Sequence, residues 1–154
     1  MRPGELIDHP EGGRFREVHR SAQVVTAADG RERPALTHIY FALARGERSL
    51  LHRVAGDEVW NLYRGDGVVL HLWDGEGETQ RVELSEPAGA WCHVVPAGWW
   101  QAAEPLGGDV LVGCSVGPGF EFADFVLLTN DRPEAAVVRA LWPGLVPFIA
   151  AGAP

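Results

Sequence analysis

The hydrophobic positions along the chain occur in short runs that alternate with polar residues or are rich in β-branched and aromatic side chains. Glycine and proline separate these runs at short intervals. A period of two is typical of half-buried strands, and glycine and proline mark the turns between them. The pattern predicts strands over residues 15–20, 36–44, 49–54, 58–63, 68–73, 79–83, 91–95, 100–104, 110–116 and 125–128. Ten short strands at this spacing favour an all-β sandwich or barrel.

One segment near the C-terminal end has helix signals. The acidic residue Asp131 is an N-cap candidate, and Pro133 suits the first turn of a helix that runs to about Leu141. The polar segment 26–33 is predicted to be a loop. Because the chain shows no internal repeat, we expect a single domain over residues 1–154. Its barrel core spans about 8–128, and the helix and tail span 129–154.

Composition and charge exclude several function classes. The formal net charge is −8 and the basic residues are scattered, which argues against a nucleic-acid partner. All basic residues are arginine, so no side-chain amine can form a Schiff base. No apolar run approaches the roughly 20 residues of a membrane span, and no secretory signal is recognisable, so we expect a cytoplasmic location and no membrane partner. Cys92 and Cys114 are far apart and are expected to be small buried apolar groups.

Two titratable residues are predicted to face the interior. Alternate residues of a strand share a face, so His52 lies on the same face as Leu50 and Val54. By the same rule Glu58 shares a face with Trp60 in the next strand, and a tight turn between the strands would bring Glu58 close to His52. A buried glutamate is costly without a partner, so a histidine or a ligand is expected beside it.

The spacing of these residues resembles that of the cupin barrels. The relevant segments read Gly46-x5-His52-x-Val54-x3-Glu58-x6-Gly65 and Pro96-Ala97-Gly98-Trp99-Trp100-Gln101. In cupins that bind a metal, the ligands are histidines and a glutamate at this spacing. Here Val54 stands where the second histidine would be, and Gln101 stands where the last would be.

Other segments are similar to those of small single-domain cupins of largely uncharacterised function. They are His9-Pro10-Glu11-Gly12-Gly13, Asp57-Glu58-Val59-Trp60 and Gly113-Cys114-x-Val116-x-Pro118-Gly119-Phe120-x-Phe122-x-Asp124-Phe125, and together the matches span roughly residues 8–126. The resemblance implies a double-stranded β-helix, the cupin jelly-roll barrel, usually as a homodimer. It also implies a pocket similar to that of deoxysugar epimerases, which use acid–base residues rather than a metal. The chain departs from this group at Arg14, His38 and Asn61, where an aromatic residue, a small residue and histidine are common.

The favoured hypothesis is a metal-independent isomerase, epimerase or cyclase in a biosynthetic pathway, with no cofactor and a small sugar-like or carbonyl-containing ligand. In this hypothesis His52 is the base or proton shuttle, Glu58 orients it, and Tyr40, Tyr63 or a water completes the relay. The residues expected to contact the ligand are Gln101, Trp60, Trp100, Asn61, His38, Arg16 and Glu17.

Two alternatives stay open. The first is a metal-dependent cupin oxygenase or isomerase that holds its metal through His52, Glu58 and Gln101, although glutamine is a weak ligand for such metals. The second is a non-catalytic protein that binds a small molecule or sugar, in which His52 and Glu58 only hydrogen-bond each other. In each case we expect a homodimer in which an N-terminal strand covers an exposed sheet edge.

Overall fold

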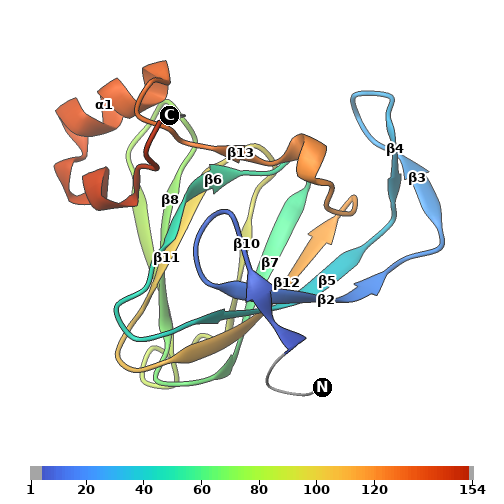
Figure 1. Ribbon diagram of the computed structural model, residues 1–154, viewed down its shortest axis with the longest axis horizontal. Helices are drawn as coiled ribbons and strands as arrows, with labels where there is room; N and C mark the ends of the chain where they lie inside the picture. Colours follow the sequence, from blue (N-terminus) through green and yellow to red (C-terminus); the bar gives the residue numbers. More distant parts are fainter. Residues whose placement is uncertain (1–4, 153–154) are drawn as a thin grey trace.

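Two antiparallel sheets face each other and enclose the core in the computed structural model, which describes residues 5–152 (Figure 1). The larger sheet has the order β1 (Ile7–Asp8), β2 (Arg14–Arg20), β5 (Thr37–Leu43), β12 (Val110–Gly117), β7 (Asp57–Arg64) and β10 (Cys92–Val95). The smaller sheet has the order β13 (Val126–Leu127), β6 (Ser49–Arg53), β11 (Trp100–Pro105), β8 (Val68–Trp73) and β9 (Gln80–Leu84). The predicted all-β jelly-roll class is confirmed.

The ten predicted strands all form, but three further strands were not predicted. One is β1, and the other two are β3 (Val24–Thr26) and β4 (Glu32–Pro34), which form a hairpin where a loop over 26–33 was expected. Arg31 and Arg33 of this hairpin each bond to Asp124 at 2.8 Å, and Figure 1 shows the hairpin projecting beyond the sheets. These ion pairs help to hold the hairpin through a residue some ninety positions away. Local polarity gives no information about such a distant contact, so it predicted a loop.

The C-terminal segment packs against the outside of the smaller sheet. Helix α1 (Pro133–Leu141) begins after Arg132 rather than Asp131, and a 3-10 helix, η3 (Pro143–Phe148), follows it. Ala135 and Val138 are buried in a second core beneath this layer, because they lie on one face of the helix. The members of that core from the sheet are Leu51, Trp73, Trp100 and Ala102.

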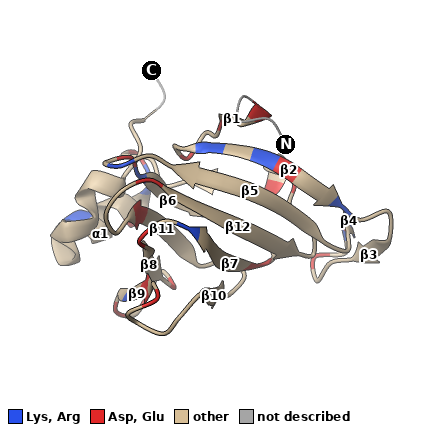
Figure 2. Cartoon of the chain, turned by 90° about the horizontal axis from the view of Figure 1, so that it is seen from below, with Lys and Arg blue, Asp and Glu red and all other residues tan. Residues whose placement is uncertain are grey.

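The main core fills the space between the sheets. Alternation along β7 places Trp60 inside, where it contacts Phe41 of β5 edge-to-face at 6.0 Å. The central strands β5 and β12 carry no Asp, Glu, Lys or Arg and are entirely tan in Figure 2. Of the two cysteines, Cys114 is buried as expected, whereas Cys92 is exposed because it lies on edge strand β10.

Within residues 5–152, the sheet edge near the N-terminus is only partly covered. Strand β1 pairs with β2 of the same chain at Ile7↔Phe15 and Asp8↔Arg14, so the pairing covers only the beginning of β2. The predicted homodimer, with its N-terminal strand across the edge, stays a prediction. No helix within residues 5–152 has the length and apolar character needed to span a bilayer.

Candidate functional site

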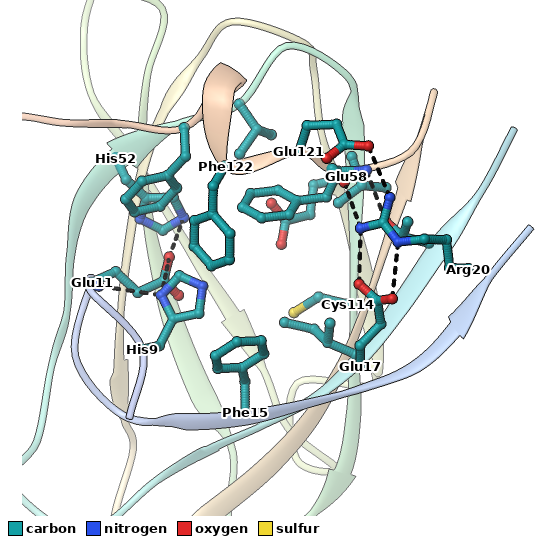
Figure 3. Close-up of a pocket in the computed structure, with 16 residues that line it drawn as sticks. His9, Glu11, Phe15, Glu17, Arg20, His52, Glu58, Cys114, Glu121 and Phe122 are labelled. Carbon is teal, nitrogen blue, oxygen red and sulfur yellow. Dashed lines mark hydrogen bonds and ion pairs between the residues drawn. The ribbon is translucent and has the colours of Figure 1, made fainter. Parts of the chain in front are cut away.

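A cavity of about 70 Å³ opens between the two sheets and contains the titratable residues of the interior (Figure 3). Its walls come from the loop before β2, from strands β2, β5, β6, β7 and β12, and from the segment that follows β12. The lining residues are His9, Glu11, Phe15, Glu17, Arg20, Thr37, Ile39, His52, Val54, Glu58, Cys114, Val116, Phe120, Glu121, Phe122 and Phe125. The site is therefore assembled from segments that are distant along the chain.

His52 lies on β6 and is 2% exposed, with both ring nitrogens engaged. Nδ1 lies 2.7 Å from the carbonyl oxygen of Leu50, which can only accept a hydrogen bond, so Nδ1 carries a proton. Nε2 lies 2.9 Å from Oε2 of Glu11, and Phe125 stacks on the ring. The hydrogen-bonded carboxylate partner of His52 is thus Glu11 and not Glu58.

Glu11 reaches His52 from a tight loop that precedes β2. The amide of Glu11 donates to Nδ1 of His9 at 3.2 Å, so that nitrogen is unprotonated and His9 is neutral. The 3.7 Å separation between His9 Nδ1 and Glu11 Oε2 is too long for a hydrogen bond. The loop is closed by the amide of Gly12, which donates to the carbonyl of His9, and by the amide of Leu50, which donates to the carbonyl of Glu11. Glu11 is thereby fixed inside the barrel.

Gly12 permits this close approach, and its replacement is expected to destabilise the site. Its φ is +102°, and a Cβ there would overlap the carbonyl oxygen of Arg48. Gly12→Ala should lower the free energy of unfolding by at least about 2 kcal/mol, measured by urea denaturation. Gly75 is the matched control, because its φ is +97° with open space around it. If Gly75→Ala lowered the free energy of unfolding equally, overlap with the Arg48 carbonyl would contribute nothing to the effect of Gly12→Ala.

Glu58 lies on β7 and is held in place by a chain of hydrogen bonds. Nε1 of Trp60 donates to Oε1 of Gln101 at 2.7 Å, and Nε2 of Gln101 donates to Oε1 of Glu58 at 3.0 Å. Because indole N–H is only a donor, the amide of Gln101 has a single orientation that satisfies both neighbours. The thiol of Cys114 also interacts with Glu58. Glu58 is 6% exposed and faces the cavity with its position fixed.

The environments of these groups shift their pKa values in different directions. Burial opposes the charge of His52, but the adjacent Glu11 carboxylate outweighs it and raises the pKa of His52 to about 9. Burial also works against the charge of Glu11, yet His52 lowers the pKa of Glu11 below its ordinary value. Burial raises the pKa of Glu58 to about 7, with His52 limiting the rise. At neutral pH the cavity holds a His52–Glu11 ion pair and a Glu58 that is partly protonated and partly ionised.

Two predicted site residues of β5 and two of β7 lie on the outer face of the larger sheet. His38 Nδ1 lies 2.7 Å from Oγ of Ser115, and His38 Nε2 lies 3.0 Å from the hydroxyl of Tyr63. The Tyr40 ring packs edge-to-face on Tyr63. Asn61 donates to the carbonyl of Gly113. None of the four lines the cavity, because each is offset by one residue from an inward-facing neighbour.

The other predicted ligand contacts divide between the core, the surface and the cavity. Trp60 and Trp100 are fully buried and do not line the cavity. Gln101 does not line the cavity either, but it donates a hydrogen bond to Glu58, which does. Arg16 is paired with Glu5 at 2.6 Å outside the cavity. Glu17 is among the residues that line the cavity.

The residues proposed as alternative metal ligands do not converge. Oε1 of Gln101, the atom that would bind a metal, accepts the indole proton of Trp60, and it is the amide nitrogen that faces Glu58. His52 presents Nε2 to Glu11. Within residues 5–152 no three His, Cys, Asp or Glu side chains are grouped so that they could hold a metal ion.

Several cavity residues were not proposed from the sequence. Glu11 and Cys114 belong to segments quoted for the cupin resemblance, and Arg20 lies at the end of a predicted strand. The signal for Glu11 was a carboxylate followed by two glycines, which is typical of a tight turn. No comparable signal marked Arg20, since its partners include a residue about a hundred positions away.

Two solved structures resemble most of the chain: a hypothetical protein from Leishmania major and protein SO0799 from Shewanella oneidensis. The first is 30% identical, covers 96% of this chain and 94% of its own, and has a TM-score of 0.81. The second is 31% identical, and the match covers 96% of this chain and 93% of the second protein, with a TM-score of 0.80.

A more distant likeness shows the fold alone. The oxalate decarboxylase of Lactobacillus farciminis, solved as a formate complex, is 18% identical over 88% of this chain and 38% of its own, with a TM-score of 0.60. A search of curated proteins gave no match. Residues 2–128 match the family described as Cupin superfamily (DUF985). The chain therefore belongs to this cupin family.

Proposed function

We propose that this cupin is a metal-independent isomerase, epimerase or cyclase that moves a proton next to the carbonyl group of a small molecule. The observation that carries the proposal is the pairing, in one cavity, of Glu58, with a pKa raised to about 7, and the His52–Glu11 ion pair. Two titratable groups whose environments separate their protonation states provide an acid and a base at the same pH.

The pKa shifts of His52 and Glu58 favour a division of roles that differs from the sequence-based hypothesis. With a pKa of about 9, His52 is protonated at neutral pH and cannot be the base. Glu58, with its raised pKa, is the better base and removes the proton next to the carbonyl. Because both ring nitrogens of His52 are engaged, its Nε2 proton passes to the Glu11 carboxylate, and Glu11 donates it to the other side of the resulting enolate. Gln101 and Trp60 position Glu58, while Tyr40 and Tyr63 take no part.

Proton exchange with solvent tests the proposal without knowledge of the natural substrate. The protein in D₂O would be incubated with hydroxyacetone, dihydroxyacetone or glyceraldehyde, and deuteration next to the carbonyl followed by proton NMR. We expect catalysed exchange with at least one probe. Its rate should rise with pH through about 7, as Glu58 ionises, and fall through about 9, as His52 loses its proton.

The controls separate this function from the two alternatives. Dialysis against EDTA should leave the exchange rate unchanged. If dialysis abolished the exchange and an added metal restored it, the metal-dependent alternative would be favoured. If none of the three probes exchanged faster than in buffer, the protein would be treated as a non-catalytic binder.

A further inference from the structure

Arg20 lies at the mouth of the cavity with its charge already paired. Its guanidinium makes four hydrogen bonds: Nε and Nη2 donate to the two carboxylate oxygens of Glu17 at 3.0 Å, Nη1 donates to Glu121 at 3.0 Å, and Nη2 donates to the carbonyl of Phe120 at 2.9 Å. Figure 3 shows the guanidinium between the two carboxylates. A guanidinium has five N–H groups, so Arg20 has little capacity left for a ligand.

Among the described residues, the rest of the lining offers no unpaired positive charge. His52 is protonated but faces Glu11 at 2.9 Å. His9 is neutral, because burial lowers its pKa below the ordinary value. Arg20 is opposed by two carboxylates, which leaves an excess of negative charge before Glu58 is considered. The field inside the cavity therefore disfavours an anion.

The cavity walls favour a compact molecule with an apolar body. Phe15, Phe120, Phe122 and Phe125 contribute rings to the lining. The cavity volume of about 70 Å³ is about half that of a roughly 150 Å³ cavity that holds benzene. Aromatic faces attract cations and tolerate neutral groups, and they offer nothing to a carboxylate.

We propose that Glu17, Arg20 and Glu121 form a charge filter that admits small neutral or cationic carbonyl and amide-type compounds and rejects carboxylates and phosphates. This inference deepens the proposed function, because it names the substrate class of the same cavity. Glu17 and Glu121 are the specificity-determining residues, since they occupy the guanidinium of Arg20, which an anionic ligand would otherwise use.

Three probes of matched shape test the filter by binding alone. Isobutyrate, isobutyramide and isobutyramidinium share a planar head group and differ in charge. Titration into ¹⁵N-labelled protein at pH 7 gives a Kd for each from the shifts of cavity amides. The side chains of Glu17 and Glu121 are 39% and 42% exposed, so solvent moderates the effect. We expect isobutyrate to bind about tenfold more weakly than isobutyramide, and isobutyramidinium at least as tightly as the amide.

A variant that gains affinity for isobutyrate provides the decisive test. In Glu17→Gln/Glu121→Gln the Arg20 charge is no longer neutralised, and isobutyrate affinity should rise about tenfold while isobutyramide affinity changes less than twofold. Adding Arg20→Gln should remove the gain. The control Glu76→Gln/Glu78→Gln makes the same change in net charge at exposed residues outside the cavity and should leave all three affinities unchanged.

The outcomes are separable from those of the exchange experiment. Equal binding of isobutyrate and isobutyramide to the wild type would overturn the filter, as would an unchanged isobutyrate affinity in the double glutamine variant or the absence of binding by any probe. Preferential amide binding without catalysed deuterium exchange would support the filter and count against catalysis. Thermal melting of each variant confirms that it is folded.

Discussion

Replacing Glu58 with glutamine is expected to reduce catalysed deuterium exchange by about 10²- to 10⁴-fold, because an amide cannot accept the proton that Glu58 removes. The substitution preserves shape, and the new side chain can still accept a hydrogen bond from Gln101. The rate would be measured by proton NMR at pH 8, where Glu58 of the wild type is ionised.

Stability provides an independent readout of the same substitution. The pKa of Glu58 is raised from its ordinary 4.5 to about 7 in the folded state. Its contribution to folding is therefore present below pH 4.5 and lost as the pH rises through 7. Glu58→Gln removes this loss, so the variant should be at least as stable as the wild type at pH 8.

Glu104 is the matched control, because it is a β11 glutamate outside the cavity that pairs with His71 at 3.1 Å. Glu104→Gln should leave the exchange rate unchanged. If Glu58→Gln retained the wild-type rate at pH 8, Glu58 would not be the base.

Replacing Glu11 with glutamine is expected to lower the free energy of unfolding by about 3 to 5 kcal/mol at pH 7. The reason is that the change leaves His52, 2% exposed, without its carboxylate partner while the ring still faces the same position. Urea denaturation measures the loss. Glu104→Gln breaks a His–Glu pair of similar length whose carboxylate is 42% exposed, and it should cost less than about 1 kcal/mol.

The pH dependence of this effect has a definite sign. The folded pKa of His52 is raised from 6.5 to about 9, so the stabilisation by the pair is complete below 6.5 and is lost as the pH rises through 9. The folded pKa of Glu11 is lowered from 4.5, so the same stabilisation is lost as the pH falls below 4.5. The difference in the free energy of unfolding between wild type and Glu11→Gln should therefore be largest between these limits and should decrease above pH 9. A difference in the free energy of unfolding that stayed constant from pH 6 to 10 would rule out the ion pair as its cause.

The sequence pattern was sufficient to predict ten of the thirteen strands within residues 5–152 and the inward position of two site residues. Alternation along a strand depends only on local backbone geometry, so it placed His52 and Glu58 in the interior and located the ten main strands. The same rule argues against Tyr63, which is five positions after Glu58 and so lies on the opposite face of β7. For Tyr40 the rule is ambiguous, because aromatic Phe41 follows it and either side chain could face the core.

Tertiary structure decided which groups meet, since these contacts join segments that are distant in the sequence. Glu11 rather than Glu58 bonds to His52, because a turn at Gly12 inserts the loop before β2 into the barrel. Gln101 is committed to Trp60 and Glu58, because β11 and β7 bring the three side chains together from opposite sheets. Arg20 meets Glu121 only after the chain has formed both sheets. Periodicity predicts the face on which a residue lies, whereas the partner of a buried charge depends on how the sheets and loops pack.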